Sequence, residues 1–190
     1  MGGMLATRFA LMYPDTTKKL ILLNPIGLEN YLDKVEYKDV DFFHKMELNK
    51  TADGIKKYQQ KNYYDGEWND TYAALTDFMI GQINHPDWPK VAWNNALTYD
   101  LLFSQPIVDE LPKLTMPVKL IIGTRDRTGP GRNWKKAGVE TELGRYDKLG
   151  FRTAEKIKNS TYYPLDGVGH LPHIEDFERF SKSLKSALIH

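Results

Sequence analysis

Three short apolar runs restrict the folds open to this chain. They lie at residues 20–23, 118–122 and 161–165, and the stretches between them include segments with the three- and four-residue apolar spacing of helices. The first run is apolar at every position, which suits a strand covered on both faces, as in a parallel sheet. The alternation of such strands with helices predicts an α/β fold.

The helices expected at the two ends of the chain are read from their apolar spacing. Residues 1–13 form the first, because Pro14 cannot continue a helix. Gly2 and Gly3 in its first turn indicate that another backbone packs very close there. A second helix is expected over 146–158. The last helix carries one apolar stripe, made of Ile174, Phe177, Phe180, Leu184 and Leu188.

The segment between the first two strands has a different character. Residues 29–112 are polar and aromatic and show no sustained strand alternation. We therefore expect a helical insertion over 29–112 and a core built from residues 1–28 and 113–190. Three strands alone would leave an apolar sheet edge open, so we expect the last part of a larger sheet, an incomplete fold. The candidate helices of the insertion lie near 51–62, 70–84 and 89–103.

Composition excludes several classes of function. Lysine and arginine number 26 against 25 aspartates and glutamates, and the formal charge of +1 gives no electrostatic basis for binding nucleic acid or an acidic membrane surface. The chain has no cysteine, which rules out disulfides, thiolate metal sites and a cysteine nucleophile. Its longest apolar runs are far shorter than the roughly 18 residues of a membrane span.

Two side chains follow consecutive strands and form a candidate acid–base pair. Asp126 comes just after the second run and His170 just after the third. Because the carboxyl ends of parallel strands meet at one rim, both residues are expected there, where a carboxylate can orient an imidazole and stabilise its charged form. Asp166 is a rival for the acid. His173 is expected to cap or cover the start of the last helix, since two histidines alone make a poor metal site.

Taken in this order, the motifs resemble those of the α/β-hydrolase superfamily, in its esterase-like group with a Gly-x-Ser-Met-Gly-Gly elbow. Residues 1–6 resemble the sequence that follows the nucleophile, 123–126 the acid loop and 167–170 the histidine loop. The resemblance covers essentially the whole chain. It implies the last three parallel strands of that fold, with flanking helices, and a helical cap over 29–112.

The resemblance also implies an activity. His170 would be general base and then acid, Asp126 would orient it, and the substrate would be an ester-type small molecule: a carboxylic ester, a thioester or a lactone. The serine would stand immediately before Met1, whose backbone N–H would help form the oxyanion hole. Neither Gly-x-Ser-x-Gly nor Gly-x-Asp-x-Gly occurs in this chain. The alternatives are an epoxide hydrolase or dehalogenase relative with an aspartate nucleophile, and a catalytically silent fragment.

Further expectations concern the pocket and the surroundings. Asn24, Trp88, Trp93 and Phe103 are candidates to line an apolar pocket, although Asn24 could simply end its strand and the aromatic residues could equally pack the cap. Residues 127–144 are expected to form a loop near the pocket mouth. No metal or organic cofactor is implied. The chain is expected to need a missing N-terminal half or self-association, in a cytoplasmic or periplasmic location that the sequence leaves open.

Overall fold

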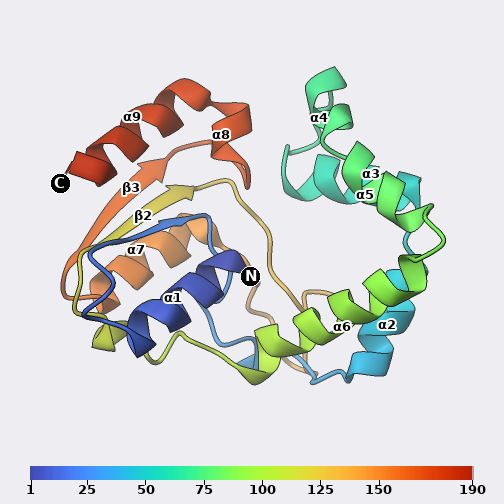
Figure 1. The fold of residues 1–190 in the computed structure, drawn as a ribbon, viewed down its shortest axis with the longest axis horizontal. Coiled ribbons are helices and arrows are strands. Elements are labelled where there is room, and N and C mark those ends of the chain that lie inside the picture. Colours follow the sequence, from blue (N-terminus) through green and yellow to red (C-terminus); the bar gives the residue numbers. More distant parts are fainter. Residues whose placement is uncertain (190) are drawn as a thin grey trace.

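The computed structural model describes residues 1–189, and at its centre is a three-stranded parallel sheet (Figure 1). The strands are β1 (Leu20–Leu23), β2 (Val118–Gly123) and β3 (Ser160–Leu165), and they pair in the order β1-β2-β3. Leu22 lies opposite Leu120, which lies opposite Tyr162. The expected α/β fold with a parallel sheet is confirmed, and each strand begins and ends within one residue of its predicted bounds.

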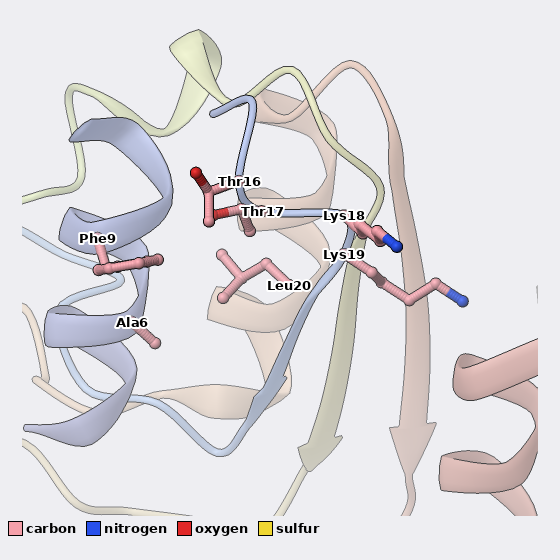
Figure 2. A pocket seen from close by; sticks show the side chains of 7 residues that line it. All are labelled: Ala6, Phe9, Thr16, Thr17, Lys18, Lys19 and Leu20. Carbon is pink, nitrogen blue, oxygen red and sulfur yellow. The ribbon is translucent and has the colours of Figure 1, made fainter. Parts of the chain in front are cut away.

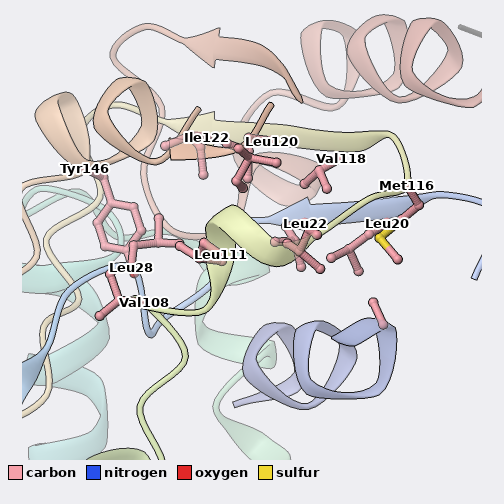
Figure 3. Packing of buried hydrophobic residues seen from close by; sticks show 13 residues of the cluster. Leu20, Leu22, Leu28, Val108, Leu111, Met116, Val118, Leu120, Ile122 and Tyr146 are labelled. Carbon is pink, nitrogen blue, oxygen red and sulfur yellow. The ribbon is translucent and has the colours of Figure 1, made fainter. Parts of the chain in front are cut away.

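Helices cover both faces of this sheet. α1 (Gly2–Met12) and α7 (Tyr146–Lys156) pack on one face, and α9 (Phe177–Ile189) packs on the other. Every residue of β2 is buried, and its side chains alternate between the two faces, as the period of a strand requires. Val118, Leu120 and Ile122 join the cluster under α1 and α7 that Figure 3 shows. Ile121 faces α9.

The last helix differs from its prediction. The expected single helix is divided into α8 (Pro172–Glu175) and α9, because Asp176 has non-helical dihedrals and its carboxylate accepts a hydrogen bond from the Arg179 backbone N–H at 3.0 Å. Phe180 and Leu184 of the predicted stripe pack against the buried cluster between the sheet and α9, as expected. Phe177 and Leu188 of the predicted stripe are 67% and 59% exposed, and Ala187 is fully buried.

Between β1 and β2 the described chain is helical. The elements are η1 (Tyr31–Asp33), α2 (Val40–Leu48), α3 (Ala52–Asn62), α4 (Asp70–Ala74), α5 (Asp77–Ile83), α6 (Trp88–Ser104) and η2 (Leu111–Lys113). The patterns near 51–62 and 89–103 correspond to α3 and α6, the pattern near 70–84 is divided into α4 and α5, and α2 had not been predicted. None of the helices described over residues 1–189 is long and apolar enough to cross a membrane.

Residues 127–144 pack against this helical insertion. Lys135 forms an isolated antiparallel bridge with Val35, and the Glu36 backbone N–H donates to the Trp134 carbonyl at 3.0 Å. The Trp134 ring lies 5.3 Å from that of Phe42 and 6.0 Å from that of Phe43, centroid to centroid. The 127–144 loop is therefore held to the insertion by both backbone and aromatic contacts.

Candidate active site

The carboxyl ends of β2 and β3 bring Asp126 and His170 into contact. His170 Nδ1 lies 2.7 Å from Asp126 Oδ2, and the Asp126 side chain is fully buried while that of His170 is 21% exposed. The rival acid, Asp166, is exposed, and it is its backbone carbonyl that accepts a hydrogen bond, at 2.9 Å from Arg179. The two residues predicted to share the rim of the sheet thus lie side by side.

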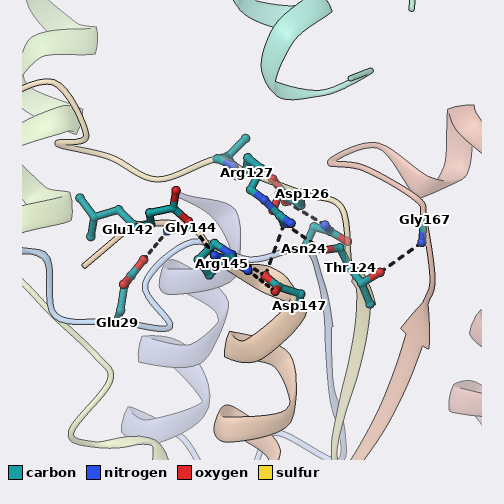
Figure 4. A network of polar contacts seen from close by, with 12 residues as sticks. Asn24, Glu29, Thr124, Asp126, Arg127, Glu142, Gly144, Arg145, Asp147 and Gly167 are labelled. Carbon is teal, nitrogen blue, oxygen red and sulfur yellow. Dashed lines mark hydrogen bonds and ion pairs between the residues drawn. The ribbon is translucent and has the colours of Figure 1, made fainter. Parts of the chain in front are cut away.

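Asn24, which follows β1 directly, ties three segments together behind this pair. It is 4% exposed and has a φ of 39°, a left-handed conformation that asparagine tolerates better than most residues. Its Oδ1 accepts from the Gly123 backbone N–H at 2.9 Å, and its Nδ2 donates to Asp126 Oδ2 at 2.8 Å and to the Gly169 carbonyl at 3.3 Å. Asn24 thus ends its strand, one of the two roles expected of it, and its amide also supports the acid (Figure 4).

Thr128 completes the surroundings of the carboxylate, and the sequence had not singled it out. Its backbone N–H donates to Asp126 Oδ1 at 2.7 Å, so that each carboxylate oxygen accepts at least one hydrogen bond. Its hydroxyl lies 3.2 Å from His170 Nδ1. The shorter contact is to Asp126, which is therefore the principal acceptor of a proton on Nδ1.

The acid loop and the histidine loop approach each other very closely. The Arg125 backbone N–H donates to the Val168 carbonyl at 3.0 Å. A Cβ on Gly123 would lie 2.5 Å from the Val168 carbonyl oxygen, and closer still to that of Gly169. The glycine that ends β2 is therefore required for close backbone approach.

An arginine–glutamate pair links the histidine loop to the helical insertion. Arg125 forms an ion pair with Glu175 of α8, and it donates to the carbonyls of Gly167 at 2.8 Å and Tyr63 at 3.3 Å. Glu175 in turn accepts from the Gly169 backbone N–H at 2.9 Å. Burial raises the pKa of the Glu175 carboxyl, although the Arg125 charge opposes that shift. Both residues fix the backbone on either side of Val168.

Tyr63, at the end of α3, covers the histidine. Its ring centroid lies 4.6 Å from that of His170, at an interplanar angle of 36°. Burial raises the pKa of the Tyr63 phenol above its usual range. On the other side, burial and then the neighbouring His170 lower the pKa of His173, which lies in α8.

Met1 caps α1, and its side chain packs against the apolar cluster of the insertion. The two glycines that follow it behave differently. A Cβ on Gly3 would lie 2.5 Å from Pro25 Cβ, so the close packing expected there is confirmed, whereas Gly2 has no such neighbour within 4 Å. Because Pro25 follows β1 by two residues, the start of α1 lies near the carboxyl end of β1.

The aromatic candidates for a pocket have mixed positions. Phe103 is 2% exposed and stacks on Phe43 at 5.6 Å between ring centroids, while Trp88 is 8% exposed. Trp93 is 41% exposed and meets the ring of His44 edge-on. Phe103 therefore packs in the core of the insertion, which was one of the two roles expected of it.

The five serines lie on other parts of the molecule. Ser104 and Ser160 donate to the carbonyls of Asp100 and Ala154, and Ser181, Ser183 and Ser186 are in α9. No hydrogen bond joins any of them to His170 within residues 1–189. Over the same residues, no group of three or more His, Asp or Glu side chains is placed to hold a metal ion.

Among the cavities at the surface of residues 1–189, two differ in position and lining. The larger, of about 550 Å³, lies between α1 and the start of β1, where residues 16–20 and Ala6 and Phe9 line it (Figure 2). It opens at the amino end of β1, at the opposite end of the sheet from Asp126 and His170. The smaller, of about 320 Å³, lies beside the acid loop and is lined by Arg127, Arg132, Lys135, Glu142, Leu143 and Arg145.

The geometry at the rim suits proton transfer. A neutral imidazole that donates from Nδ1 to a carboxylate presents the lone pair of Nε2, which can take a proton from a nucleophile. The buried Asp126 carboxylate, held by Asn24 and Thr128, would then stabilise the charged ring. His170 and Asp126 are thus arranged as a base and its orienting acid.

Comparisons with known proteins give one clear group of solved structures. A probable hydrolytic enzyme from Pseudomonas aeruginosa PAO1 superposes with a TM-score of 0.93 at 41% sequence identity, over 98% of this chain and 60% of that one. No family model matches the sequence, and no curated protein matches it. This chain therefore spans about three fifths of the length of that enzyme.

More distant structures share the fold. A serine hydrolase from Cycloclasticus zankles has a TM-score of 0.63 at 14% identity, over 100% of this chain and 60% of that one. The enol-lactonase from Burkholderia xenovorans LB400 has a TM-score of 0.57 at 16% identity, over 100% of this chain and 63% of that one. At such identities the likeness concerns the arrangement of strands and helices.

Proposed function

This chain belongs to the α/β-hydrolase superfamily, and we propose that it carries the acid and the base of a serine-dependent hydrolase of ester-type bonds. The 2.7 Å contact between His170 Nδ1 and Asp126 Oδ2, at the ends of adjacent parallel strands, is the observation that carries the proposal. In this proposal the substrate is a carboxylic ester, a thioester or a lactone, because an activated serine can attack the carbonyl carbon of each.

In the proposed reaction His170 moves two protons. Its Nε2 takes the proton of the serine hydroxyl as the serine oxygen attacks the carbonyl carbon, and then gives that proton to the leaving alkoxide or thiolate. Asp126 keeps the ring in the orientation that presents Nε2 and stabilises its charge. A water molecule attacks the acyl-enzyme by the same route, with His170 again as base.

The nucleophile in this proposal is a serine directly before Met1. The start of α1 lies near the carboxyl end of β1, because Gly3 packs against Pro25, and is therefore at the same side of the sheet as Asp126 and His170. Backbone N–H groups at a helix N-terminus carry partial positive charge, which suits stabilisation of an oxyanion by the Met1 N–H.

The test is to express the chain together with the codons that precede Met1 in its gene and to assay hydrolysis of p-nitrophenyl butyrate. His170→Ala should lower kcat by about 10³-fold or more. His85→Ala is the matched control, since that side chain is 63% exposed on the insertion, and it should leave kcat unchanged. Full activity in His170→Ala would overturn the assignment.

Two further measurements separate the alternatives. A fluorophosphonate probe should label the extended protein on serine, whereas epoxide or haloalkane turnover without labelling would favour an aspartate nucleophile. Residues 1–190 alone should not hydrolyse the ester, because their serines lie away from His170; turnover by these residues would contradict the proposed nucleophile.

We also propose that the chain needs a partner surface, either an N-terminal half or a second copy. β1 pairs only with β2 among the described strands, and Leu5 and Met12 on the neighbouring α1 are 59% and 60% exposed. Exposed apolar patches beside an open sheet edge favour association. Size-exclusion chromatography of residues 1–190 should show oligomers, and a sharp monomer peak with cooperative melting would argue against this.

A further inference from the structure

The smaller cavity has an unusual charge. Four of its lining side chains are cationic, namely Arg127, Arg132, Lys135 and Arg145, while one, Glu142, is acidic. The carboxylate of Asp147 also lies close, at 3.5 Å from Arg127 and 2.7 Å from Arg145. Four positive charges against two negative ones leave about +2 at one place, in a chain whose formal net charge is only +1.

The cations fall into two pairs. Arg145 is matched by carboxylates, since it contacts both oxygens of Asp147, at 3.0 and 2.7 Å, and Glu142 at 2.6 Å. Arg127 donates to the carbonyls of Thr124 and Asp126 and faces Asp147. These two side chains are accounted for by the structure that surrounds them, as Figure 4 shows for the acid loop and the start of α7.

Arg132 and Lys135 have only neutral partners among the described residues. Arg132 donates to Asn62 Oδ1 at 3.1 Å and to the Leu143 carbonyl at 3.3 Å, and Lys135 approaches the Glu140 carbonyl at 3.5 Å. A guanidinium has five N–H donors, so these contacts leave Arg132 with donor capacity. Both side chains are half-buried, and a positive charge there attracts an anion more strongly than it does at an open surface.

We propose that this cavity is a binding site for the anionic group, a carboxylate or a phosphate, of a small-molecule ligand. Arg132 would supply a planar pair of N–H donors and Lys135 a point charge, which is the chemistry that recognises such groups. Arg127 and Arg145 are held and neutralised by their own carboxylate partners, so the net positive charge of the cavity comes from Arg132 and Lys135. A volume of about 320 Å³ accommodates a small organic acid.

The cavity borders the catalytic rim. Arg127 directly follows Asp126, and Asn62, which accepts from Arg132, directly precedes the Tyr63 whose ring lies against His170. An anion held here would therefore lie beside the acid loop and α3. The inference concerns binding alone and holds whether or not the proposed hydrolysis occurs.

The test is a titration of the full 190-residue chain by isothermal calorimetry, with inorganic phosphate and with succinate, each at constant ionic strength. We expect saturable binding of at least one of them, with a Kd in the millimolar range. Arg132→Gln and Lys135→Gln should each weaken binding at least fivefold. Lys182→Gln, an exposed lysine of α9, is the matched control and should not change the affinity.

The outcomes separate the possible ligands. Preference for phosphate indicates a phosphorylated ligand, and preference for succinate indicates a carboxylate. No saturable binding, or equal affinity in the wild type and both variants, would overturn the proposal, as would an equal loss in Lys182→Gln. If Arg132→Gln melts early, the more peripheral Lys135→Gln decides the test.

Discussion

Replacing Asn24 by aspartate tests how the pair of Asp126 and His170 is supported. The two residues have nearly the same shape, and aspartate also tolerates the left-handed backbone at this position. The change therefore alters charge and hydrogen bonding while keeping the fit. It sets a second carboxylate oxygen where Nδ2 now lies, 2.8 Å from Asp126 Oδ2.

The expected cost follows from this distance. Two unit charges 2.8 Å apart repel by about 6 kcal/mol at an effective dielectric constant of about 20. The folded protein avoids this by binding one proton between the two carboxyls. Relative to an unfolded aspartate with a pKa of about 3.9, keeping that proton costs about 4 kcal/mol at pH 7 and about 1.5 kcal/mol at pH 5.

The loss of stability in Asn24→Asp depends on pH through proton linkage. Since the shared proton is held more tightly in the folded state than in the unfolded one, stability is greatest at low pH and is lost as pH rises above about 4. Urea unfolding of Asn24→Asp, followed by circular dichroism at pH 5 and pH 7, should show a free energy of unfolding lower than wild type by these two amounts.

Asn94, an exposed asparagine of α6, provides the control for this substitution. Asn94→Asp makes the same chemical change on the exposed face of α6 and should stay within about 0.5 kcal/mol of wild type at both pH values. An equal loss in Asn24→Asp at pH 5 and pH 7 would mean that geometry, not charge, causes the effect. No loss at pH 7 would refute the role assigned to Asn24.

Four further changes test other parts of the structure by urea unfolding. Gly123→Ala should lose about 3 kcal/mol of stability or more, because its Cβ would meet backbone oxygens; Gly81→Ala, with open space around it, should stabilise α5 by up to about 1 kcal/mol. Trp134→Ala should lower the free energy of unfolding by about 3 kcal/mol and speed amide exchange in α2. Unchanged stability and exchange would mean that the 127–144 loop is only loosely attached. His173→Gln should reduce the fall in stability as pH drops below about 6.5, because the lowered pKa of His173 means that the unfolded chain binds the proton more readily; an unchanged pH profile would contradict this.

Much of the core was predictable because its signals are local. β1 is apolar at every position and lies where the pattern placed it, and Asp126 and His170 follow strands whose carboxyl ends must share a rim. α2 had no comparable signal. It is short, and its start depends on Asp39, whose carboxylate accepts from the Phe42 backbone N–H.

The supporting residues of the site could not be predicted from local patterns. The partners of Asn24 lie 99, 102 and 145 residues further along the chain, so its role exists only once β1, β2 and the histidine loop are in place. From the sequence alone, Arg125 is likewise an ordinary cation in a loop and Glu175 an ordinary acid at a helix start. No feature of the sequence predicts that Glu175 accepts from the Gly169 backbone N–H or that Arg125 donates to the Tyr63 carbonyl.

The bridge between Val35 and Lys135 bears on how such proteins can be recombined. The layer beside the sheet is formed by two segments, residues 29–112 before β2 and the 127–144 loop after it. Trp134 of the loop packs among aromatic rings of the first segment. A chimera that imports only residues 29–112 from a relative would replace the rings of Phe42, Phe43 and Phe103 that Trp134 packs against. Exchange of this layer therefore requires two cassettes moved together, with crossover points on both sides of β2.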